Sequence, residues 1–339
     1  MKLALAGVGR IGTVHARTLV GVDGVKELVL ADVDGARARA VAGSLVEQHP
    51  GVSALSGVAD LFSCGADGLV IAASTGSHTS LLLRGIEAGI PVFCEKPVAT
   101  DVEGTLAVLR AVEAAGSIQV QIGFQRRFDT GYVAAREAIV SGVLGWVHTV
   151  RSSTLDSAPP PAAYLPTSGG IFRDCSVHDF DIIRWVTGRE AVEVYAAGAN
   201  HGADFIRAAG DVDAAAALVT LDDGSFAHVA AGRYNGRGYD VRMEVLGSRD
   251  SLAVGLDDRM PLRSVQPGAS FPGGTPYADF MERFAAAYVA ELEHFAAVVA
   301  GHATTRCTVA DALEAFYLAE AAVLSRREHR PVRIEEVRR

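Results

Sequence analysis

The chain begins with MKLALAGVGRIG (residues 1–12), a short apolar run that leads straight into glycines at positions 7, 9 and 12. The run is typical of a buried strand, and the glycines match the G-x-G-x-x-G pattern of a turn between a strand and a helix. In such a turn Gly7 would allow the tight bend, Gly9 would let a phosphate approach the backbone, and Gly12 would let helix and strand pack closely. The chain has 36 glycines, so the string alone is weak evidence, and its position between a strand and a helix is what supports it.

A carboxylate about 20 residues beyond such a turn is the usual ribose ligand of a bound dinucleotide. Asp32 ends the second apolar run, residues 27–32, and fits this role. Its charge would repel the additional phosphate of NADP, which favours NAD, although Arg37 and Arg39 nearby would soften the preference. Asp34 is the alternative ribose ligand, but it suits a turn or a helix cap better. The turn supplies the other predicted NAD contacts, which are Gly7, Gly9, Arg10, Ile11 and Gly12.

Apolar runs and amphipathic stretches alternate through residues 1–120, which is typical of α/β folds with βαβ units around a parallel sheet. The runs are apolar almost throughout, as expected for strands covered on both faces, and lie at 2–6, 27–31, 68–72 and 91–94. Helical patterns lie between them, at 11–20, 35–48, 77–88 and 102–115. Residues 118–123 alternate apolar residues with Gln119 and Gln121, so one face of this strand should be less buried. We therefore predict a doubly wound Rossmann domain over residues 1–123.

After residue 123 the pattern changes. We predict a helix at 131–141, a strand at 146–154, a proline-rich loop at 157–166 and a helix that ends near residue 186. Residues 191–256 contain several strand-like segments with turns at 223–224, 235–236 and 247–248, and few helical patterns interrupt them. This favours a mostly antiparallel sheet, which two amphipathic helices follow at 277–300 and 309–326. The predicted second domain, residues 124–339, is therefore of the α+β class.

Composition narrows the possible partners and the compartment. The chain has 339 residues, 49% of them hydrophobic. It has no apolar run of the roughly 18 residues that a bilayer requires, and the first run is too short for a signal peptide. The net charge is −9 without a basic cluster, which disfavours nucleic acid as a partner. The four cysteines lie far apart without metal-ligand spacing, so we expect free thiols, no metal site and a cytoplasmic location.

Loops at the carboxyl ends of strands line the ligand crevice of an open α/β sheet. One such loop, STGSH (residues 74–78), follows the predicted strand at 68–72. Ser74, Thr75 and His78 are therefore candidate cofactor contacts. A helix start without any chemistry suits His78 equally well.

A second loop of this kind, CEKP (residues 94–97), carries a lysine that would point into the same crevice. Pro97 would stiffen the turn. Glu95 would orient Lys96 or contact the nicotinamide ribose of the cofactor. An exposed ion pair is the alternative, because most lysines are solvated.

The segment GGIFRDCSVHDFDI (residues 169–182) is the second candidate for chemistry. Asp174 and His178 are spaced i, i+4, which places both on one face of a helix, and the preceding glycine pair leaves room for a ligand. A lone histidine on such a helix is usually structural, but the aspartate and the glycines favour chemistry here. Hydride removal from an alcohol needs a base for the hydroxyl proton, and histidine, with an unperturbed pKa of about 6.5, suits that role. We predict that His178 is the base, that Asp174 positions it or binds a substrate hydroxyl, and that Lys96 stabilises the developing alkoxide.

Together, GVGRIG, EKP and the helix with Asp174 and His178 resemble the glucose–fructose oxidoreductase/inositol dehydrogenase (Gfo/Idh/MocA) family over nearly the whole chain. Within that family the chain looks most similar to bacterial myo-inositol 2-dehydrogenases, through segments 123–129, 159–164, 169–181 and 238–245. The resemblance implies NAD-dependent oxidation of a cyclic polyol, myo-inositol to 2-keto-inositol, in inositol catabolism. It implies that Lys96, Asp174 and His178 form the catalytic triad and contact the substrate, with Arg126 and Tyr239 as further polyol contacts.

The same resemblance implies a large open sheet in the second domain, through which the chain forms dimers or tetramers. Two loops depart from the family pattern. Asp156 and Ser157 replace a more conventional polar pair before the proline run, and the turn at 235–237 is unusually rich in glycine. Both loops would border the polyol, so Asp156 is included among the substrate contacts and the identity of the substrate stays open.

Three other functions are compatible with these motifs. The same triad would also oxidise another inositol isomer or a sugar, such as glucose or an anhydrosugar. The second alternative is an NADP-linked reductase or a dehydratase-like enzyme that uses the cofactor transiently, and Asp32 argues against NADP. The third is a non-catalytic, nicotinamide-sensing regulator. The complete set of Lys96, Asp174 and His178 argues against it, because a sensor need not keep a proton-transfer network.

Overall fold

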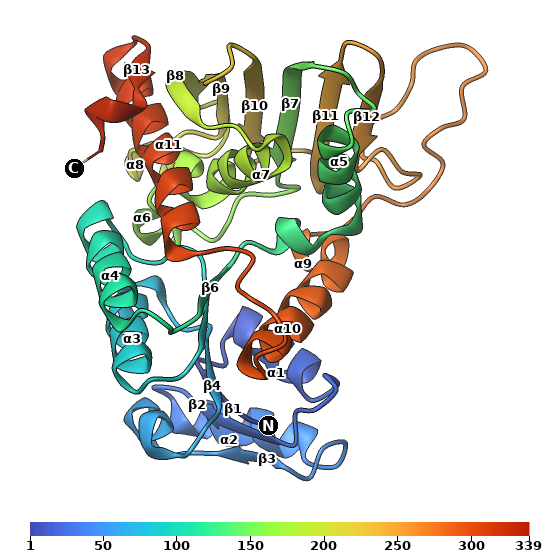
Figure 1. Cartoon of the computed structure of the whole chain (residues 1–339). Helices are drawn as coiled ribbons and strands as arrows, with labels where there is room; N and C mark the ends of the chain where they lie inside the picture. Colours follow the sequence, from blue (N-terminus) through green and yellow to red (C-terminus); the bar gives the residue numbers. More distant parts are fainter. Residues whose placement is uncertain (339) are drawn as a thin grey trace. The chain divides into compact units, whose positions relative to one another are not determined.

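The computed structural model describes residues 1–338 and contains two compact units (Figure 1). The first unit comprises Met1–Phe128 and Ala286–Leu313, and the second comprises Asp129–Ala285 and the chain from Glu314 onward. Each unit is built around its own sheet. Among residues 1–338, no helix combines the length and the apolar character needed to span a bilayer.

The first unit is built on a six-stranded sheet with the strand order β3-β2-β1-β4-β5-β6, and every neighbouring pair is parallel. Its strands are β1 (Lys2–Ala6), β2 (Glu27–Ala31), β3 (Val52–Ala54), β4 (Gly68–Ile71), β5 (Val92–Glu95) and β6 (Val120–Gly123). From β1 the chain builds the sheet outward in one direction through β2 and in the other through β4. This is the doubly wound arrangement, so the predicted fold of the first domain is confirmed.

Four helices connect these strands, namely α1 (Arg10–Leu19), α2 (Gly35–Leu45), α3 (Thr75–Glu87) and α4 (Val102–Ala115). A short 3-10 turn, η1 (Val58–Ser63), lies between β3 and β4, and a second one, η2 (Gln125–Phe128), follows β6. Two helices begin at an aspartate that caps their first turn. The side chain of Asp34 accepts hydrogen bonds from two backbone N–H groups of α2, and Asp101 accepts one from Gly104 of α4. Such caps satisfy donors that the helix leaves open at its start.

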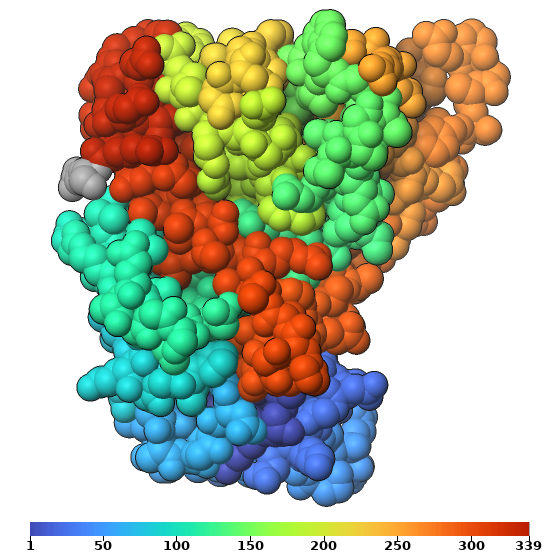
Figure 2. All heavy atoms as spheres, viewed as in Figure 1, coloured from blue at the N-terminus to red at the C-terminus, as the bar shows by residue number. Residues whose placement is uncertain are grey.

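A fifth helix, α10 (Ala285–Val299), packs into the core of the first unit although it follows the second unit in the chain. Four of its side chains join the hydrophobic cluster that contains Leu3, Leu5 and Phe93, and these are Leu292, Phe295, Ala296 and Val298. In Figure 2 the orange-red surface of this helix lies directly against the blue surface of the N-terminal segment. The unit is therefore assembled from two separate parts of the chain, which a single boundary at residue 123 does not describe.

Strand β6 shows the effect of this helix on a polar side chain. Gln121 is fully buried. Its Nε2 donates to the backbone oxygen of Glu291 at 3.2 Å, and its Oε1 lies 2.9 Å from Nδ1 of His294. The prediction that one face of this strand is less buried is therefore wrong, because α10 covers that face and pairs with the amide.

The second unit contains a seven-stranded sheet with the order β12-β11-β7-β10-β9-β8-β13. Its strands are β7 (Val147–Leu155), β8 (Ala191–Ala199), β9 (Ala214–Leu221), β10 (Phe226–Gly232), β11 (Asp240–Gly247), β12 (Ser251–Val254) and β13 (Val332–Arg333). Within this second sheet, as far as residues 1–338 show, only the β7–β10 pair is parallel, so the predicted mostly antiparallel sheet is confirmed. Along β9 buried residues such as Val219 alternate with exposed ones such as Leu218, so one face of the sheet is packed and the other is open.

Helices α5 (Thr130–Val140), α7 (Val177–Thr187) and α11 (Val309–Glu328) lie on one side of this sheet (Figure 1). Shorter elements complete the unit, and these are α6 (Leu165–Ser168), the π-helical turn η3 (Phe172–Ser176), α8 (Asp204–Ala208), α9 (Phe280–Arg283) and η4 (Ile334–Glu336). Asp129 caps α5, and its second carboxylate oxygen pairs with Arg283 at 2.9 Å.

Candidate active site

The predicted cofactor residues lie along one edge of the first sheet. Because the strands are parallel, the carboxyl ends of β1, β2, β4 and β5 meet at this edge. The predicted residues that follow these strands are Gly7, Asp32, Ser74 and Lys96. The strand order reverses between β1 and β4, and open α/β sheets bind their ligands at such a point.

The three glycines of the turn after β1 differ in how much space each leaves for a side chain. Gly7 has a φ of +91°, and a Cβ added there would lie 2.7 Å from the backbone of Ala73, so the turn is too tight for a side chain. A Cβ on Gly12 would overlap the carbonyl oxygen of Gly7. A Cβ on Gly9 would meet no atom within 4 Å, so open space lies in front of the turn where α1 begins. This space and the helix N-terminus suit a phosphate group.

Asp32 is buried, and its carboxylate is held by the backbone of its own site. Its Oδ2 accepts from Val8 N at 2.8 Å and its Oδ1 from Asp34 N at 2.9 Å, while Arg37 Nη1 lies 3.5 Å from Oδ1. Each oxygen retains a second lone pair for a ribose hydroxyl. Asp34 instead caps α2, as its alternative interpretation anticipated.

His78 joins two loops of the cofactor edge. The ring is buried, with Nδ1 2.7 Å from the oxygen of Pro97 and Nε2 3.1 Å from the oxygen of Ala73. A neutral ring has one N–H and donates to one of these carbonyls at a time. Ser74 is exposed and immediately precedes Thr75, the first residue of α3. Through its contacts with Pro97 and Ala73, His78 therefore connects the loop that carries Lys96 with the loop that follows β4.

Glu95 has a partner that the local sequence does not reveal. Its Oε1 lies 2.6 Å from Nε2 of His15, a fully buried histidine of α1. His15 thus connects the helix that begins at the glycine turn with the end of β5. Lys96, the next residue, is half-buried and forms a cis peptide bond with Pro97.

In the second unit, the helix with Asp174 and His178 is not a regular α-helix. Gly169 and Gly170 both have positive φ, and a π-helical turn over Phe172–Ser176 follows before α7 begins. Asp174 therefore lies in the π turn and His178 in the first turn of α7, so the stretch that joins them is not the regular α-helix that the spacing predicts. π turns inside helices are frequent at functional sites.

The carboxylate of Asp174 is held by two residues from other elements. Its Oδ1 accepts from the hydroxyl of Tyr164 at 3.0 Å, and its Oδ2 accepts from Arg233 Nη1 at 3.1 Å. Burial raises the pKa of Tyr164, and the nearby Asp174 raises it further, so the hydroxyl keeps the proton that it donates. Burial lowers the pKa of Arg233, but the negative charges of Cys175, Asp174 and Asp211 outweigh this effect and hold the pKa above its ordinary value.

The sheet register brings two predicted polyol residues to the same edge as Arg233. Leu155 at the end of β7 pairs with Gly232 of β10 and with Asp240 of β11. Asp156, Arg233 and Tyr239 directly flank these positions and therefore lie at one edge of the second sheet. Asp156 lies 3.9 Å from Arg233 Nη1, and Tyr239 is buried. Arg126, the remaining polyol candidate, is buried in η2 of the first unit.

The residue after His178 anchors its helix to the sheet. Asp179 is fully buried and accepts hydrogen bonds from Ser152 at 2.6 Å and from Thr154 at 2.8 Å, both on β7. This fixes the first turn of α7, where the half-buried His178 lies.

Two family models match the chain. Residues 1–124 match the oxidoreductase family with an NAD-binding Rossmann fold, and residues 132–253 match the GFO/IDH/MocA C-terminal domain. The myo-inositol dehydrogenase Hyg17 of Streptomyces leeuwenhoekii is 38% identical over 302 residues, which cover 89% of each chain. The inositol 2-dehydrogenase of Rhizobium meliloti (strain 1021) is 35% identical over 335 residues, 98% of this chain and 99% of that one. The chain belongs to the GFO/IDH/MocA family of oxidoreductases.

Solved structures of GFO/IDH/MocA relatives extend the similarity to the whole fold. A putative myo-inositol dehydrogenase from Sinorhizobium meliloti 1021 has a TM-score of 0.88 at 34% identity and covers 98% of this chain and 99% of that one. A scyllo-inositol dehydrogenase from Lactobacillus casei, with bound NAD(H) and scyllo-inositol, has a TM-score of 0.85 at 27% identity and covers 99% of each chain.

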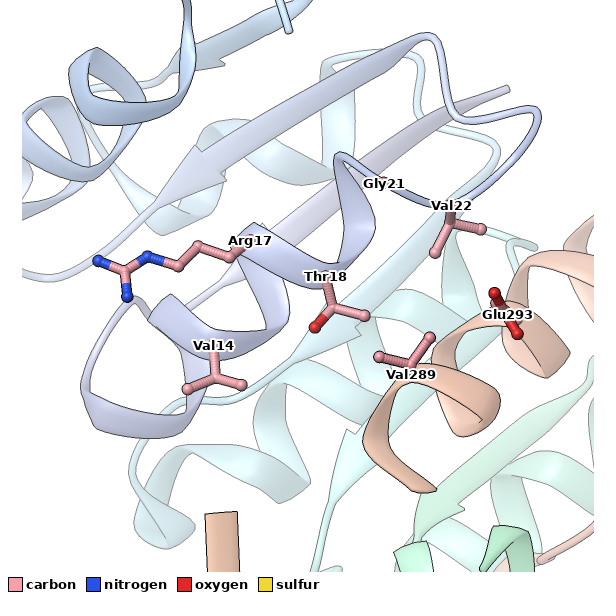
Figure 3. Close-up of a pocket in the computed structure, with 7 residues that line it drawn as sticks. All are labelled: Val14, Arg17, Thr18, Gly21, Val22, Val289 and Glu293. Carbon is pink, nitrogen blue, oxygen red and sulfur yellow. The ribbon is translucent and has the colours of Figure 1, made fainter. Parts of the chain in front are cut away.

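The first unit of this GFO/IDH/MocA member fits the NAD of its family. The open space at Gly9 and the amides at the start of α1 would hold the pyrophosphate, and the remaining lone pairs of Asp32 would bind the adenosine ribose. A separate surface pocket of this unit lies between α1 and α10 (Figure 3). It is lined by Val14, Arg17, Thr18, Gly21, Val22, Val289 and Glu293, and none of these is a predicted site residue.

Sequence reasoning missed four residues of these sites, namely His15, Asp179, Asp211 and Arg233. His15 had a local signal, because a histidine on the buried face of an amphipathic helix needs a polar partner. Arg233 directly follows an apolar strand, FAHVAAG, but no nearby sequence pattern predicts which carboxylates it contacts.

Proposed function

We propose that this chain oxidises a secondary alcohol of a cyclic polyol with NAD, and that myo-inositol is the substrate and 2-keto-inositol the product. The observation that carries the proposal is the edge of the second sheet, where Asp156, Asp174 and Tyr239 gather. A polyol presents several hydroxyls, each of which donates and accepts, and carboxylates with a tyrosine hydroxyl match that pattern. The relatives named for inositol support the same substrate class.

The proposed chemistry assigns one task to each residue of the triad. His178 accepts the proton of the reacting hydroxyl, and Asp174 orients the substrate or the histidine. Lys96 stabilises the oxygen as negative charge develops on it. Bound NAD supplies the acceptor for the hydrogen and electron pair that leave the same carbon. The products are then a ketone, reduced cofactor and one proton.

A second candidate is the same reaction on another inositol isomer. The Lactobacillus casei relative holds scyllo-inositol, and its similarity covers the whole chain. Asp156 and the glycine-rich turn at 235–237 lie in loops that we expect to border the ring, so they would select the isomer.

A substrate panel tests the proposal. Inositol isomers, glucose and an anhydrosugar are each supplied with NAD and, in parallel, with NADP, and the absorbance of reduced nicotinamide is followed. We expect turnover with NAD and an inositol, and the highest kcat/KM with myo-inositol. Tight NAD binding without turnover of any polyol would contradict the proposal and favour a nicotinamide-sensing protein.

We also propose that the open face of the second sheet joins copies of the chain into a dimer or tetramer. Large apolar side chains are exposed on three adjacent strands of this face, and these are Tyr195, Leu218 and Phe226. Apolar patches of this kind often mark protein interfaces.

We place the protein in the cytoplasm and its reaction in inositol catabolism, since no disulfide joins the cysteines of residues 1–338 and NAD serves as oxidant.

A further inference from the structure

Arg233 is a deeply buried cation of the second-unit site. Its side chain is 1% exposed, and it lies one residue beyond the end of β10. Three carboxylates surround the guanidinium. Nη1 lies 3.1 Å from Asp174 and 3.9 Å from Asp156, and Nη2 lies 3.2 Å from Asp211. Burying a cation costs hydration free energy, and this cost is offset only where partners of opposite charge form hydrogen bonds with it.

The two terminal nitrogens of the guanidinium, Nη1 and Nη2, contact two different parts of the site. Nη1 donates to Oδ2 of Asp174, while Nη2 donates to Oδ2 of Asp211. The other oxygen of Asp211 accepts from the backbone N–H of Ile171 at 2.9 Å, directly after the glycine pair. One planar group therefore links the carboxylate of Asp174 with the start of the π turn that carries it.

Asp174 is thus held from opposite sides of its carboxylate. Tyr164 donates to Oδ1 from the proline-rich loop, and Arg233 donates to Oδ2 from the sheet. The two donors differ in burial, because 45% of the surface of Tyr164 is exposed to solvent whereas Arg233 is almost completely buried. The buried arginine is therefore the rigid support, and the tyrosine closes the outer side.

We propose that Arg233 is the positioning residue of the active site, which fixes the carboxylate of Asp174 by using Asp211 as its anchor. The proposal rests on the proposed function, in which Asp174 acts next to the reacting hydroxyl. Arginine is required because its planar fork meets two carboxylates with separate nitrogens, whereas the ammonium of lysine is a single point charge.

The test compares Arg233→Lys with a matched control, Arg184→Lys. Arg184 is also buried in the second unit and lies on α7, the helix that carries His178. Its Nε and Nη2 donate to the two carboxylate oxygens of Glu190 at 2.6 and 2.7 Å. We expect Arg233→Lys to lower kcat with the preferred polyol roughly 100-fold, because small misplacements of reacting groups cost about this much. NAD affinity should stay unchanged, since Arg233 belongs to the other unit. Arg184→Lys should keep kcat within about twofold.

Two further variants keep the test decisive if Arg233→Lys folds poorly. Asp211→Asn keeps an oxygen for Ile171 but removes the charge that anchors Arg233, so kcat should fall in the same direction by a smaller factor. Tyr164→Phe removes only the outer donor, and combining it with Asp211→Asn should lower kcat by more than the product of the two single effects. Wild-type kcat in Arg233→Lys would overturn the proposal, and so would wild-type kcat in Asp211→Asn if Arg233→Lys does not fold.

Crystal structures of Arg233→Lys and Asp211→Asn separate this proposal from the proposed function. We expect the Asp174 carboxylate to rotate away from its position between residues 164 and 233, whatever the substrate is. An unchanged Asp174 would overturn the positioning role even if the wild type oxidises inositol. Conversely, a rotated Asp174 in a protein that oxidises no polyol would support the positioning role and count against the function alone.

Discussion

Asp32 follows the end of β2 and Asp174 lies inside the π turn, and the carboxylate of each is held by groups from elsewhere in the chain. The amide of Val8 donates to Asp32 across 24 positions of sequence, and Arg233 donates to Asp174 across 59. In both cases the carboxylate is oriented before any ligand arrives. This reduces the cost of ordering the site when a ligand binds.

Replacing Asp32 separates cofactor binding from stability. We expect Asp32→Ala to weaken NAD roughly 10- to 100-fold, because hydrogen bonds to a charged group are lost. Asp34→Ala is the control, since it removes the cap of α2 and should cost about 0.5–2 kcal/mol of stability with little change in NAD affinity. Calorimetric titration with NAD and thermal unfolding measure the two effects. Equal losses of affinity in both variants would contradict the role of Asp32.

Lysine occurs only at positions 2, 26 and 96, against 28 arginines, so a lysine at position 96 is not the routine cationic residue of this chain. We expect Lys96→Met and His178→Ala each to lower kcat by roughly 100-fold or more, because proton handling contributes about this much. Lys26→Met and His148→Ala, at exposed positions, serve as controls and should leave turnover unchanged. Initial rates at saturating NAD and polyol decide the outcome. Near-normal turnover of His178→Ala would show that another group is the base.

The strand–turn–helix at the start of the chain is the element that carries the cofactor prediction. Its glycines have different roles. A side chain at Gly7 would collide with the backbone, whereas the space beside Gly9 is open. Gly9 also has a φ of −68°, which any residue adopts.

Gly9→Ala should therefore leave stability within about 0.5 kcal/mol of the wild type while weakening NAD. Gly7→Ala should destabilise the first unit by at least about 1–2 kcal/mol, since it combines a left-handed backbone with overlap against Ala73. Urea unfolding and NAD titration of both variants test this. A Gly9→Ala variant that binds NAD normally would show that the cofactor does not approach this turn.

Helix α10 is the element whose place the local sequence did not reveal. We expect Phe295→Ala to destabilise the first unit by about 3–5 kcal/mol, because this side chain is fully buried in the core of the parallel sheet. Val289→Ala, on the same helix but 40% exposed, should cost far less. Unfolding followed with and without NAD measures both. Similar small losses in the two variants would mean that α10 contributes little to this core.

At the scale of the whole molecule, the exposed face of the second sheet is the feature that bears on assembly. We expect Leu218→Glu combined with Phe226→Glu to lower the mass of the assembly, because two charges would enter an apolar interface. Val265→Glu is the control, since Val265 is 93% exposed in a loop outside the sheet. Light scattering coupled to size exclusion measures the mass. An unchanged mass in the double variant would exclude this face as the interface.

Much of the architecture follows from local patterns. Strands β1, β2, β4 and β5 are short apolar runs, and the residues that follow them were predictable because parallel strands end at a common edge. The antiparallel sheet was predictable from closely spaced turns with few helical patterns between them. Within the second site, Asp174 and His178 were recognisable from the Gly-Gly turn before them. The π turn that separates their elements was not.

By itself, the order of residues determined the two fold classes, the glycine turn with Asp32, and the candidates Lys96, Asp174 and His178. These depend on periodicity and turn chemistry, which act over a few positions. Tertiary structure alone decided that α10 completes the first core, that Gln121 is buried against it, and that Arg233 supports Asp174. Gln121 and Glu291 are 170 positions apart, so their pairing depends on packing of distant segments, which no local pattern records.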